Sequence, residues 1–446
     1  MTETVNERTK VGVLGGGSWG TALAIHCARM GHDTVLWARG SATVDAINTR
    51  HENTQYLPGY PCPPALRAST DLAEVITRSE LMLMVVPTQY IVPTLGEAVQ
   101  LLRPHQILVS CSKGISLGSL QTVEELLEGL VPEDFRPRLA YLSGPSFAAE
   151  VAGGQPAAVT VAAKDEQLAA RVQSLLSNPR FRCYRSTDVV GVELGGALKN
   201  VLAIACGVSD GLGFGNNARA ALITRGLYEI TKLAVARGAN PLTMSGLAGM
   251  GDLVLTCTGD LSRNRTVGLR LGRGERLADI QASMGGAVAE GVPTAIAIRR
   301  LAAKLGVECP IMEGIHAVIH EGANAQEVVT EVMSRALKPE VAPDIIRGVI
   351  SIGSSHELVG VGGGGVGMMA AAPAAPGQQG GGGGGDKWAA AQANEAACGG
   401  VSGSAPWGRS CGKGEEGAGA LLVAAAAGAV AAVAAMALAS WWRRRG

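Results

Sequence analysis

The sequence predicts an α/β protein in which a doubly wound parallel sheet is followed by a mainly helical domain. Three observations support this. Short apolar runs alternate with helical stretches in the first half, a glycine-rich turn follows the first run, and from about residue 191 the apolar period becomes helical. Such alternation is typical of parallel strands with crossover helices. A chain of 446 residues exceeds the size at which single cores stop growing, roughly 300 residues.

The predicted strands and the first helix of the second domain follow from apolar spacing. The helix carries apolar residues three and four positions apart, which predicts one buried face. We place the sheet domain at residues 9–192 and the helical domain at 193–355. The predicted strands cover residues 11–14, 34–37, 81–86, 107–110, 140–142 and 157–161, and the spaced apolar residues are Leu194, Leu198, Val201, Leu202 and Ala205.

The last ninety residues have a different composition. Residues 356–416 are rich in Gly, Ala and Pro and too poor in large apolar groups to offset ordering entropy, which predicts a disordered linker. Between Glu416 and Arg443 there is no charge, and the apolar run is long enough to cross roughly 30 Å of hydrocarbon as a helix. We therefore expect a transmembrane helix that anchors residues 417–446. The alternative is an Ala-rich disordered extension, because alanine is only weakly membrane-seeking.

Charge and cysteine usage exclude several function classes. Lys plus Arg (38) equals Asp plus Glu (38), so no global field favours nucleic acid, and we expect no such partner. The nine cysteines form no Cys-x-x-Cys pair or zinc-type cluster, so we expect no metal site, no disulfide framework and a reducing compartment, the cytoplasm. The short polar start, residues 1–10, leaves no room for a signal peptide.

A glycine-rich turn directly follows the first predicted strand and precedes a helical run. Gly15, Gly17 and Gly20 form Gly-x-Gly-x-x-Gly, the pattern of Rossmann-type dinucleotide sites. The first glycine permits the tight turn, the second lets the backbone approach a pyrophosphate, and the third permits close packing of helix on strand. An ordinary glycine-rich turn is the alternative, and the position between strand and helix disfavours it. The sequence therefore predicts NAD(H) or NADP(H) as cofactor.

The end of the second strand bears on the choice between these cofactors. An NAD-selective site usually has a carboxylate there to bind the ribose hydroxyls. Here Trp37 and Ala38 are followed by Arg39, whose guanidinium suits a 2′-phosphate. We therefore expect NADPH to be at least tolerated. The alternative is that Arg39 stacks on adenine or faces solvent.

Two lysines are candidates for the chemistry of hydride transfer to a ketone, which needs an acid near the carbonyl oxygen. None of the seven histidines lies in a glycine-rich or polar motif. Lys113 follows a strand at the carboxyl edge of the sheet. Lys199 lies in a helix with small neighbours, where desolvation and a nearby cation lower a lysine pKa. The alternative for Lys199 is a solvated lysine at a helix edge.

A second polar cluster follows in the helical domain. It contains Asp252, the run from Thr256 to Thr258, and the consecutive residues Ser262, Arg263 and Asn264. Their hydroxyl, guanidinium and amide groups suit the oxygens of a phosphate, and arginine can bind in a bidentate manner. The alternative is a helix cap with a solvated basic face.

With these motifs the sequence resembles the NAD(P)-dependent glycerol-3-phosphate dehydrogenases of bacteria, over roughly residues 10–350. The resemblance implies reversible hydride transfer between NAD(P)H and dihydroxyacetone phosphate, giving sn-glycerol 3-phosphate for glycerophospholipid synthesis. We also expect a homodimer. Seven motifs carry the resemblance: Gly-Ser-Trp-Gly-Thr-Ala-Leu-Ala (17–24), Ser-Lys-Gly (112–114), Ser-Gly-Pro-Ser-Phe-Ala (143–148), and residues 193–201, 217–226, 246–253 and 262–264.

The resemblance also implies roles for individual residues. Lys199 is the implied proton donor and acceptor at the carbonyl oxygen, and Lys113 orients and polarises the substrate. The family ends near residue 350, so the tail has no counterpart and leaves the localisation open. The implied substrate contacts are Lys113, Gly144, Ser146, Asp252, Ser262, Arg263 and Asn264. The implied cofactor contacts are Gly15, Gly17, Ser18, Trp19, Gly20, Arg39, Lys113, Ala148, Arg263, Val288 and Glu290.

Two other functions are compatible with the same architecture. A related dehydrogenase could act on another phosphorylated or acidic hydroxy compound, since fold alone does not fix function. A membrane-tethered dinucleotide sensor without catalysis is the other. The second polar cluster disfavours the sensor, because a nucleotide binder does not need those groups.

Overall fold

The computed structural model describes residues 8–284 and 289–340. Residues 1–7, 285–288 and 341–446 lie outside the described part. Val288 and the predicted linker and anchor therefore lie outside the described residues.

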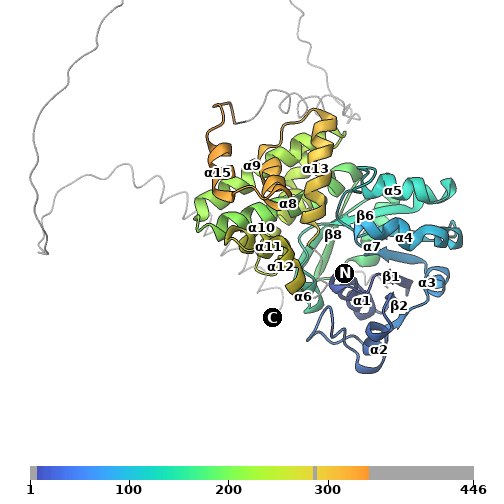
Figure 1. The fold of residues 1–446 in the computed structure, drawn as a ribbon. Coiled ribbons are helices and arrows are strands. Elements are labelled where there is room, and N and C mark those ends of the chain that lie inside the picture. The colour runs from blue at the N-terminus through green and yellow to red at the C-terminus, as the bar shows by residue number, and fades with distance from the viewer. Residues whose placement is uncertain (1–7, 285–288, 341–446) are drawn as a thin grey trace, which may run out of the picture. The chain divides into compact units, whose positions relative to one another are not determined.

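The first half of the chain forms an eight-stranded sheet in the order β3-β2-β1-β4-β5-β6-β7-β8 (Figure 1). The α/β class and the doubly wound sheet are confirmed. Every predicted strand is present, although the one predicted at 81–86 ends at Met84. The strands are β1 (Lys10–Leu14), β2 (Asp33–Trp37), β3 (Arg67–Ser69), β4 (Leu81–Met84), β5 (Ile107–Ser110), β6 (Leu139–Ser143), β7 (Ala157–Ala162) and β8 (Phe181–Ser186).

Helices cover both faces of this sheet, so its central strands are buried on both sides. In β4, Leu81 and Leu83 join one core, whereas Met82 and Met84 join the core of the opposite face, as the two-residue period of a strand requires. The first core contains α1 (Ser18–Arg29), α6 (Ala148–Ala152) and α7 (Glu166–Leu176); the second contains α3 (Leu72–Arg78), α4 (Ile91–Leu95) and α5 (Val123–Leu130). The helix α2 (Ser41–Arg50) follows β2.

The sheet differs from the prediction in two ways: one pair of neighbouring strands is antiparallel, and two strands are additional. β7 runs antiparallel to β6, whereas β7 and β8 are parallel to each other. The connection from Ser143 to Ala157 contains only the five-residue α6, which is about 7.5 Å long and too short to carry the chain back along a strand, as the helix of a parallel crossover does. Two strands were not predicted: β3 has three residues and one buried side chain, and β8 alternates buried residues with exposed Arg182 and Tyr184.

The second part is a helical array around α8 (Val189–Gly211). The sequence predicted one buried face, but α8 is buried on nearly all sides because helices pack around it. Among the described residues, α8 alone has the length and apolar character to cross a membrane, and it is a core helix here. The other helices of this part are α9 (Asn216–Ala236), η4 (Pro241–Ser245), η5 (Leu247–Gly251), α10 (Asp252–Thr258), α11 (Arg263–Gly272), α12 (Leu277–Ser283), α13 (Gly291–Leu305), α14 (Pro310–His316), η6 (Ala317–Glu321) and α15 (Ala325–Met333).

Glycines let α8 and α11 pack with their backbones in contact. A Cβ atom on Gly207 would lie 2.1 Å from the Arg265 carbonyl oxygen, and one on Gly268 would lie 2.0 Å from the Ile204 carbonyl oxygen. A larger side chain would therefore push the two helices apart. This close packing fixes the position of the first turn of α11 relative to α8.

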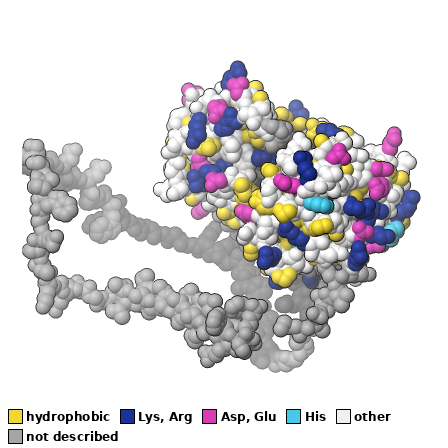
Figure 2. All heavy atoms as spheres, turned by 90° about the horizontal axis from the view of Figure 1, so that it is seen from below, with side chains coloured by type: hydrophobic (Ala, Val, Ile, Leu, Met, Phe, Trp, Pro, Cys, Tyr) yellow, Lys and Arg dark blue, Asp and Glu magenta, His cyan; other side chains and the backbone are white. Residues whose placement is uncertain are grey.

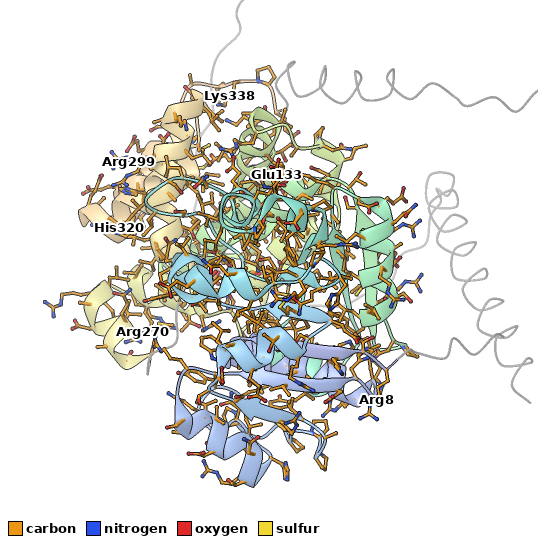
Figure 3. All side chains as sticks on the ribbon, turned by 90° about the vertical axis from the view of Figure 1, so that its right-hand side faces the viewer. Arg8, Glu133, Arg270, Arg299, His320 and Lys338 are labelled. Atoms are coloured by element: carbon orange, nitrogen blue, oxygen red, sulfur yellow. The ribbon has the colours of Figure 1, made fainter. Side chains whose placement is uncertain are left out.

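The two parts contact each other through α8, which packs on β6 and α5 as well as on the helices. Figure 3 shows this arrangement from another side: Arg299 and Lys338 lie in the helical part, whereas Arg8 lies at the start of the sheet part. Residues on α8 can therefore face the carboxyl edge of the sheet.

Candidate active site

The glycine-rich turn has the geometry that a dinucleotide site needs. Gly15 has a φ of 134°, which a side chain would strain, and a Cβ atom on Gly20 would lie 1.8 Å from the Gly15 carbonyl oxygen. At Gly17 a Cβ atom would meet nothing within 4 Å, so the backbone is open to a ligand. No described side chain caps the start of α1. Its N–H groups are therefore available to a pyrophosphate.

Other residues of the implied cofactor set lie around this turn. Ser18 begins α1, and its hydroxyl donates to the Tyr56 carbonyl oxygen at 2.6 Å. Trp19 and Ala148 both pack against the core that contains α1, and the buried Trp19 indole N–H has no hydrogen-bond partner among the described residues. Arg39 follows β2 and is exposed. The structure therefore brings the sequence-predicted cofactor residues of the sheet part to one edge.

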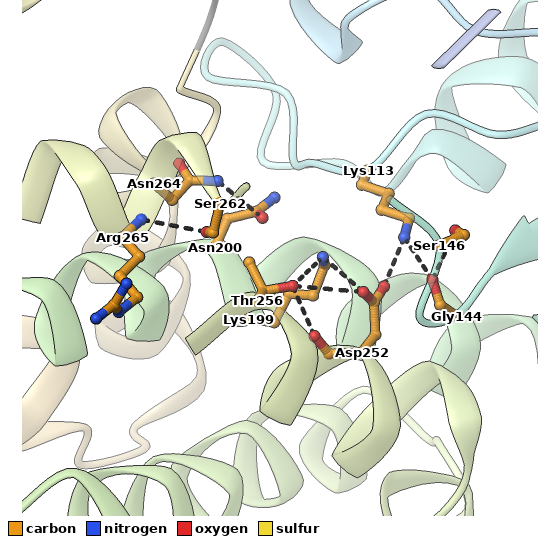
Figure 4. A network of polar contacts seen from close by, with 10 residues as sticks. All are labelled: Lys113, Gly144, Ser146, Lys199, Asn200, Asp252, Thr256, Ser262, Asn264 and Arg265. Carbon is orange, nitrogen blue, oxygen red and sulfur yellow. Dashed lines mark hydrogen bonds and ion pairs between the residues drawn. The ribbon is translucent and has the colours of Figure 1, made fainter. Parts of the chain in front are cut away.

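Lys113, Lys199 and Asp252 form one ion-pair network, in which Lys199 and Asp252 are buried and Lys113 is half-buried (Figure 4). The two oxygens of Asp252 are shared: Oδ1 lies 2.7 Å from Lys199 Nζ, and Oδ2 lies 2.5 Å from Lys113 Nζ. Lys199 Nζ also donates to Thr256 Oγ1 at 2.7 Å. Three separate segments thus meet here: the loop after β5, the middle of α8 and the start of α10.

Small residues on α8 let these segments meet, as the sequence suggested. A Cβ atom on Gly195 would lie 2.6 Å from the Ala248 carbonyl oxygen, and one on Gly196 would lie 2.4 Å from Ser143 Oγ. The backbone before α10 and the end of β6 therefore approach α8 one turn before Lys199. The alternative of a solvated lysine is wrong, because Lys199 is only 6% exposed.

The charges of the network shift both kinds of group. Burial lowers the pKa of Lys199 to about 8, assisted by the Lys113 charge, although Asp252 opposes this shift. For Asp252, burial acts to raise the pKa, but the two ammonium groups outweigh it and the pKa is lowered. Lys199 can therefore exchange a proton near neutral pH while Asp252 stays ionised.

Gly144 and Ser146 border Lys113 at the end of β6. Lys113 Nζ donates to the Gly144 carbonyl oxygen at 3.2 Å, and the Ser146 hydroxyl donates to the same oxygen at 3.0 Å. Gly144 has a φ of 141°, and a Cβ atom there would lie 2.9 Å from the Val159 backbone. A glycine is thus required where this wall of the site turns.

The second polar cluster lies at the start of α11. Asn264 Nδ2 donates to Asn200 Oδ1 at 3.1 Å, which joins the cluster to the residue after Lys199. Ser262 is the N-cap of α11, since its Oγ accepts from Arg265 N, so the helix-cap interpretation is correct for Ser262. Arg263 is exposed and makes no hydrogen bond or ion pair with the described residues. Its guanidinium is available to an anion.

Glu290 lies at the N-cap of α13, next to this cluster. The Asn264 side chain accepts from the N–H of Gly291 at 2.9 Å. Burial raises the pKa of Glu290 to about 7, although the positive charges of Arg263, Lys199 and Lys113 act to lower it. Because the charges of Lys199 and Lys113 affect the Glu290 pKa, Glu290 lies close enough to interact electrostatically with the lysine network. Val288, two residues earlier, lies outside the described residues.

The sequence analysis assigned no role to Asn200, and it placed Thr256 in the second polar cluster without connecting it to Lys199. Asn200 connects Lys199 to Asn264, and Thr256 is buried beside Lys199. Sequence signals existed for both, since Asn200 directly follows the lysine and Thr256 lies one helical turn after Asp252. In residues 8–284 and 289–340, no three His, Cys, Asp or Glu side chains gather to hold a metal ion.

Charged side chains of both signs are interspersed on the face that Figure 2 shows. This pattern agrees with the balanced count of acidic and basic residues.

Two family models match the chain. Residues 10–169 match the NAD-dependent glycerol-3-phosphate dehydrogenase N-terminus, and residues 188–330 match the C-terminus of the same family. The chain belongs to this family. The two matches together span the sheet and the helices that form the site.

Individual relatives agree with this assignment. A glycerol-3-phosphate dehydrogenase [NAD(P)+] of Myxococcus xanthus is 53% identical over 330 residues, which cover 74% of this chain and 98% of the relative. The Geobacter sulfurreducens protein of the same name is 50% identical over 331 residues, with coverages of 74% and 98%. The crystal structure of glycerol-3-phosphate dehydrogenase from Coxiella burnetii is 39% identical, with a TM-score of 0.69 and coverages of 74% and 99%.

Proposed function

We propose that this protein is an NAD(P)-dependent glycerol-3-phosphate dehydrogenase that reversibly converts dihydroxyacetone phosphate into sn-glycerol 3-phosphate. The observation that carries the proposal is the Lys199–Asp252–Lys113 network together with the exposed Arg263, which forms no ion pair with the described residues. An acid beside a ketone and a cation for a phosphate are the two requirements of this substrate. Its product is a precursor of glycerophospholipids, which is the role we propose in the cell.

The proposed proton transfer uses Lys199 as the acid. Bound NAD(P)H supplies the hydride. During ketone reduction the Lys199 ammonium donates a proton to the carbonyl oxygen, and during alcohol oxidation the neutral amine accepts it. Asp252 and Thr256 hold Lys199 Nζ in place through their hydrogen bonds. Lys113 polarises the carbonyl, and Gly144 and Ser146 form the adjoining wall.

The proposed phosphate site is the start of α11. Arg263 supplies the guanidinium, and Ser262 and Asn264 supply further polar groups beside the helix N-terminus, which itself favours anions. The proposed cofactor set is the one that the sequence implied, with Gly15, Gly17, Ser18, Trp19 and Gly20 around the pyrophosphate. The remaining members are Arg39, Lys113, Ala148, Arg263, Val288 and Glu290.

One assay tests the function and the cofactor preference together. Purified protein is given dihydroxyacetone phosphate with NADH or NADPH, and oxidation of the cofactor is followed by absorbance. We expect turnover with both, and efficient use of NADPH because Arg39 stands where an NAD-selective site has a carboxylate. Cofactor binding without turnover would overturn the proposed function and favour the sensor.

The rate should depend on pH with opposite sign in the two directions. Lys199 has a pKa of about 8, and only its protonated form serves ketone reduction. The kcat for reduction should therefore fall as pH rises through about 8, whereas the kcat for glycerol 3-phosphate oxidation should rise. Initial rates at saturating cofactor across pH 6 to 10 measure both profiles. Profiles of the same sign would remove Lys199 as the titrating group.

We propose the domain division that the sequence suggested, with a dinucleotide-binding part at 9–192 and a catalytic part at 193–355. We also propose a cytoplasmic catalytic part and a homodimer. The domain division is supported by the site, which takes residues from both parts. The cytoplasmic location is supported by the cysteine usage, and the homodimer remains an expectation.

For the tail we propose a linker at 356–416 and a membrane anchor at 417–446. The support is the uncharged run that ends in Trp441 and Trp442 and is followed by three arginines. A reporter fused to residues 356–446 should sediment with membranes and resist carbonate extraction. The matched control is the same fusion that ends at residue 416, which should stay in the supernatant. If the fusion with residues 356–446 also stays in the supernatant, the proposed membrane anchor is wrong.

A further inference from the structure

The connection from α2 to β3 lies against the glycine-rich turn through one buried asparagine. Asn53 has no exposed surface. Its Nδ2 donates to the Gly16 carbonyl oxygen at 2.9 Å and to Thr21 Oγ1 at 2.7 Å. One side chain thus joins the turn to the first helix that follows it.

The same asparagine also orders its own segment. Its Oδ1 accepts from Tyr56 N at 3.1 Å, so the amide is bonded through both its oxygen and its nitrogen. Tyr56 returns to the turn, because its carbonyl oxygen accepts from the Ser18 hydroxyl at 2.6 Å. The segment 53–56 therefore holds the turn on both sides of Gly17.

The contact with Gly16 fixes the direction of a peptide plane. In a trans peptide the C=O and the following N–H point in opposite directions. Because the Gly16 carbonyl points toward Asn53, the Gly17 N–H points away from the segment 53–56. A run of three glycines has wide conformational freedom, so this plane needs an external partner to keep one orientation.

We propose that Asn53 is a positioning residue for the cofactor: it fixes the Gly16–Gly17 peptide so that the N–H groups at the start of α1 face the dinucleotide pyrophosphate. The inference rests on the proposed function and deepens it. Asn53 need not touch the cofactor for this role. Its effect should therefore appear in cofactor affinity and leave the proton transfer at Lys199 unchanged.

The test compares Asn53→Ala with Asn48→Ala. Asn48 is the control for lost amide hydrogen bonds: although exposed, its side chain also makes two hydrogen bonds to backbone, at Ala68 O (2.9 Å) and Ala68 N (2.8 Å), without touching the turn. NADPH fluorescence titration gives the Kd without catalysis. We expect Asn53→Ala to raise the Kd about 10- to 100-fold, from the hydrogen bonds to charged phosphate that are lost, and Asn48→Ala to leave it within about threefold.

The kinetic pattern separates positioning from a general loss of structure. For Asn53→Ala the KM for NADPH should rise with the Kd, whereas kcat at saturating NADPH and the KM for dihydroxyacetone phosphate should stay near the wild-type values. Thermal melting without cofactor should show a larger loss for Asn53→Ala than for Asn48→Ala, because Asn53 is buried and Asn48 is exposed, so the Kd is compared at a temperature where both variants are folded. An unchanged Kd in Asn53→Ala would overturn the proposal. If wild-type protein binds NADPH but has no turnover, the proposed function fails while the titration still tests Asn53.

Two further variants keep the test decisive if Asn53→Ala does not fold. Asn53→Asp keeps the acceptor for Tyr56 N and can accept from the Thr21 hydroxyl, but it places a carboxylate oxygen against the Gly16 carbonyl. Thr21→Val keeps the hydrogen bond from Asn53 to the Gly16 carbonyl and removes only the hydrogen bond from Asn53 to the Thr21 hydroxyl. We expect the Kd for NADPH to rise at least tenfold in Asn53→Asp and to stay within about threefold in Thr21→Val, and the reverse order would overturn the proposal.

Discussion

Lys199→Met should lose turnover by about 10³-fold while it still folds and binds NADPH, because general acid catalysis contributes about 10²- to 10⁴-fold. The lost group is the proton source for the carbonyl oxygen. Removal of the ammonium leaves Asp252 with Lys113 as its partner at 2.5 Å, so the carboxylate keeps a counter-charge. The methionine side chain fills much of the same buried volume, so the α8 packing is retained.

Single-turnover measurements with saturating NADPH and dihydroxyacetone phosphate report the chemical step directly. The control is Lys164→Met, which removes a lysine whose side chain is 65% exposed and pairs with Glu124 and Glu128. That variant should keep the wild-type rate and pH profile. A Lys199→Met protein that retained more than a tenth of the wild-type rate would exclude Lys199 as the acid.

Much of the fold and site was predictable because the signals were local. A glycine-rich turn between a strand and a helix specifies its own geometry, and Gly15 and Gly20 have the predicted backbone roles. Lys113 follows a strand, and Lys199 lies among small helical residues. Each of these environments is set by neighbours within about one helical turn or one strand end.

The features of the fold and the site that the sequence did not predict depend on contacts between segments that are distant in the chain. Thr256 and Asn200 gain their roles only when α10 and α11 pack on α8, through glycines that the apolar pattern does not reveal. Asn53 is one asparagine in a polar connection until the turn folds against it. The antiparallel pairing of β7 likewise follows from the shortness of α6, which spacing between apolar runs does not show.

Arg263→Ala should reduce kcat/KM for dihydroxyacetone phosphate by about 10²-fold, because a hydrogen-bonded charge pair contributes about 1.5–3 kcal/mol and each 1.4 kcal/mol is a factor of ten. The loss should appear mainly in KM, since the phosphate is bound equally before and during hydride transfer. The side chain is exposed and makes no ion pair or hydrogen bond with the described residues. The variant should therefore fold normally.

The substrate without a phosphate turns this prediction into a test of mechanism. With dihydroxyacetone the wild-type protein and Arg263→Ala should have the same low kcat/KM, because the guanidinium then has no anion to bind. Arg273→Ala is the matched control: Arg273 is also exposed, but it caps the opposite end of α11. NADPH titration is done separately, since Arg263 also belongs to the proposed cofactor set. An equal loss with both ketones would show that Arg263 acts on the cofactor or the reacting carbon, and the phosphate would then need another partner.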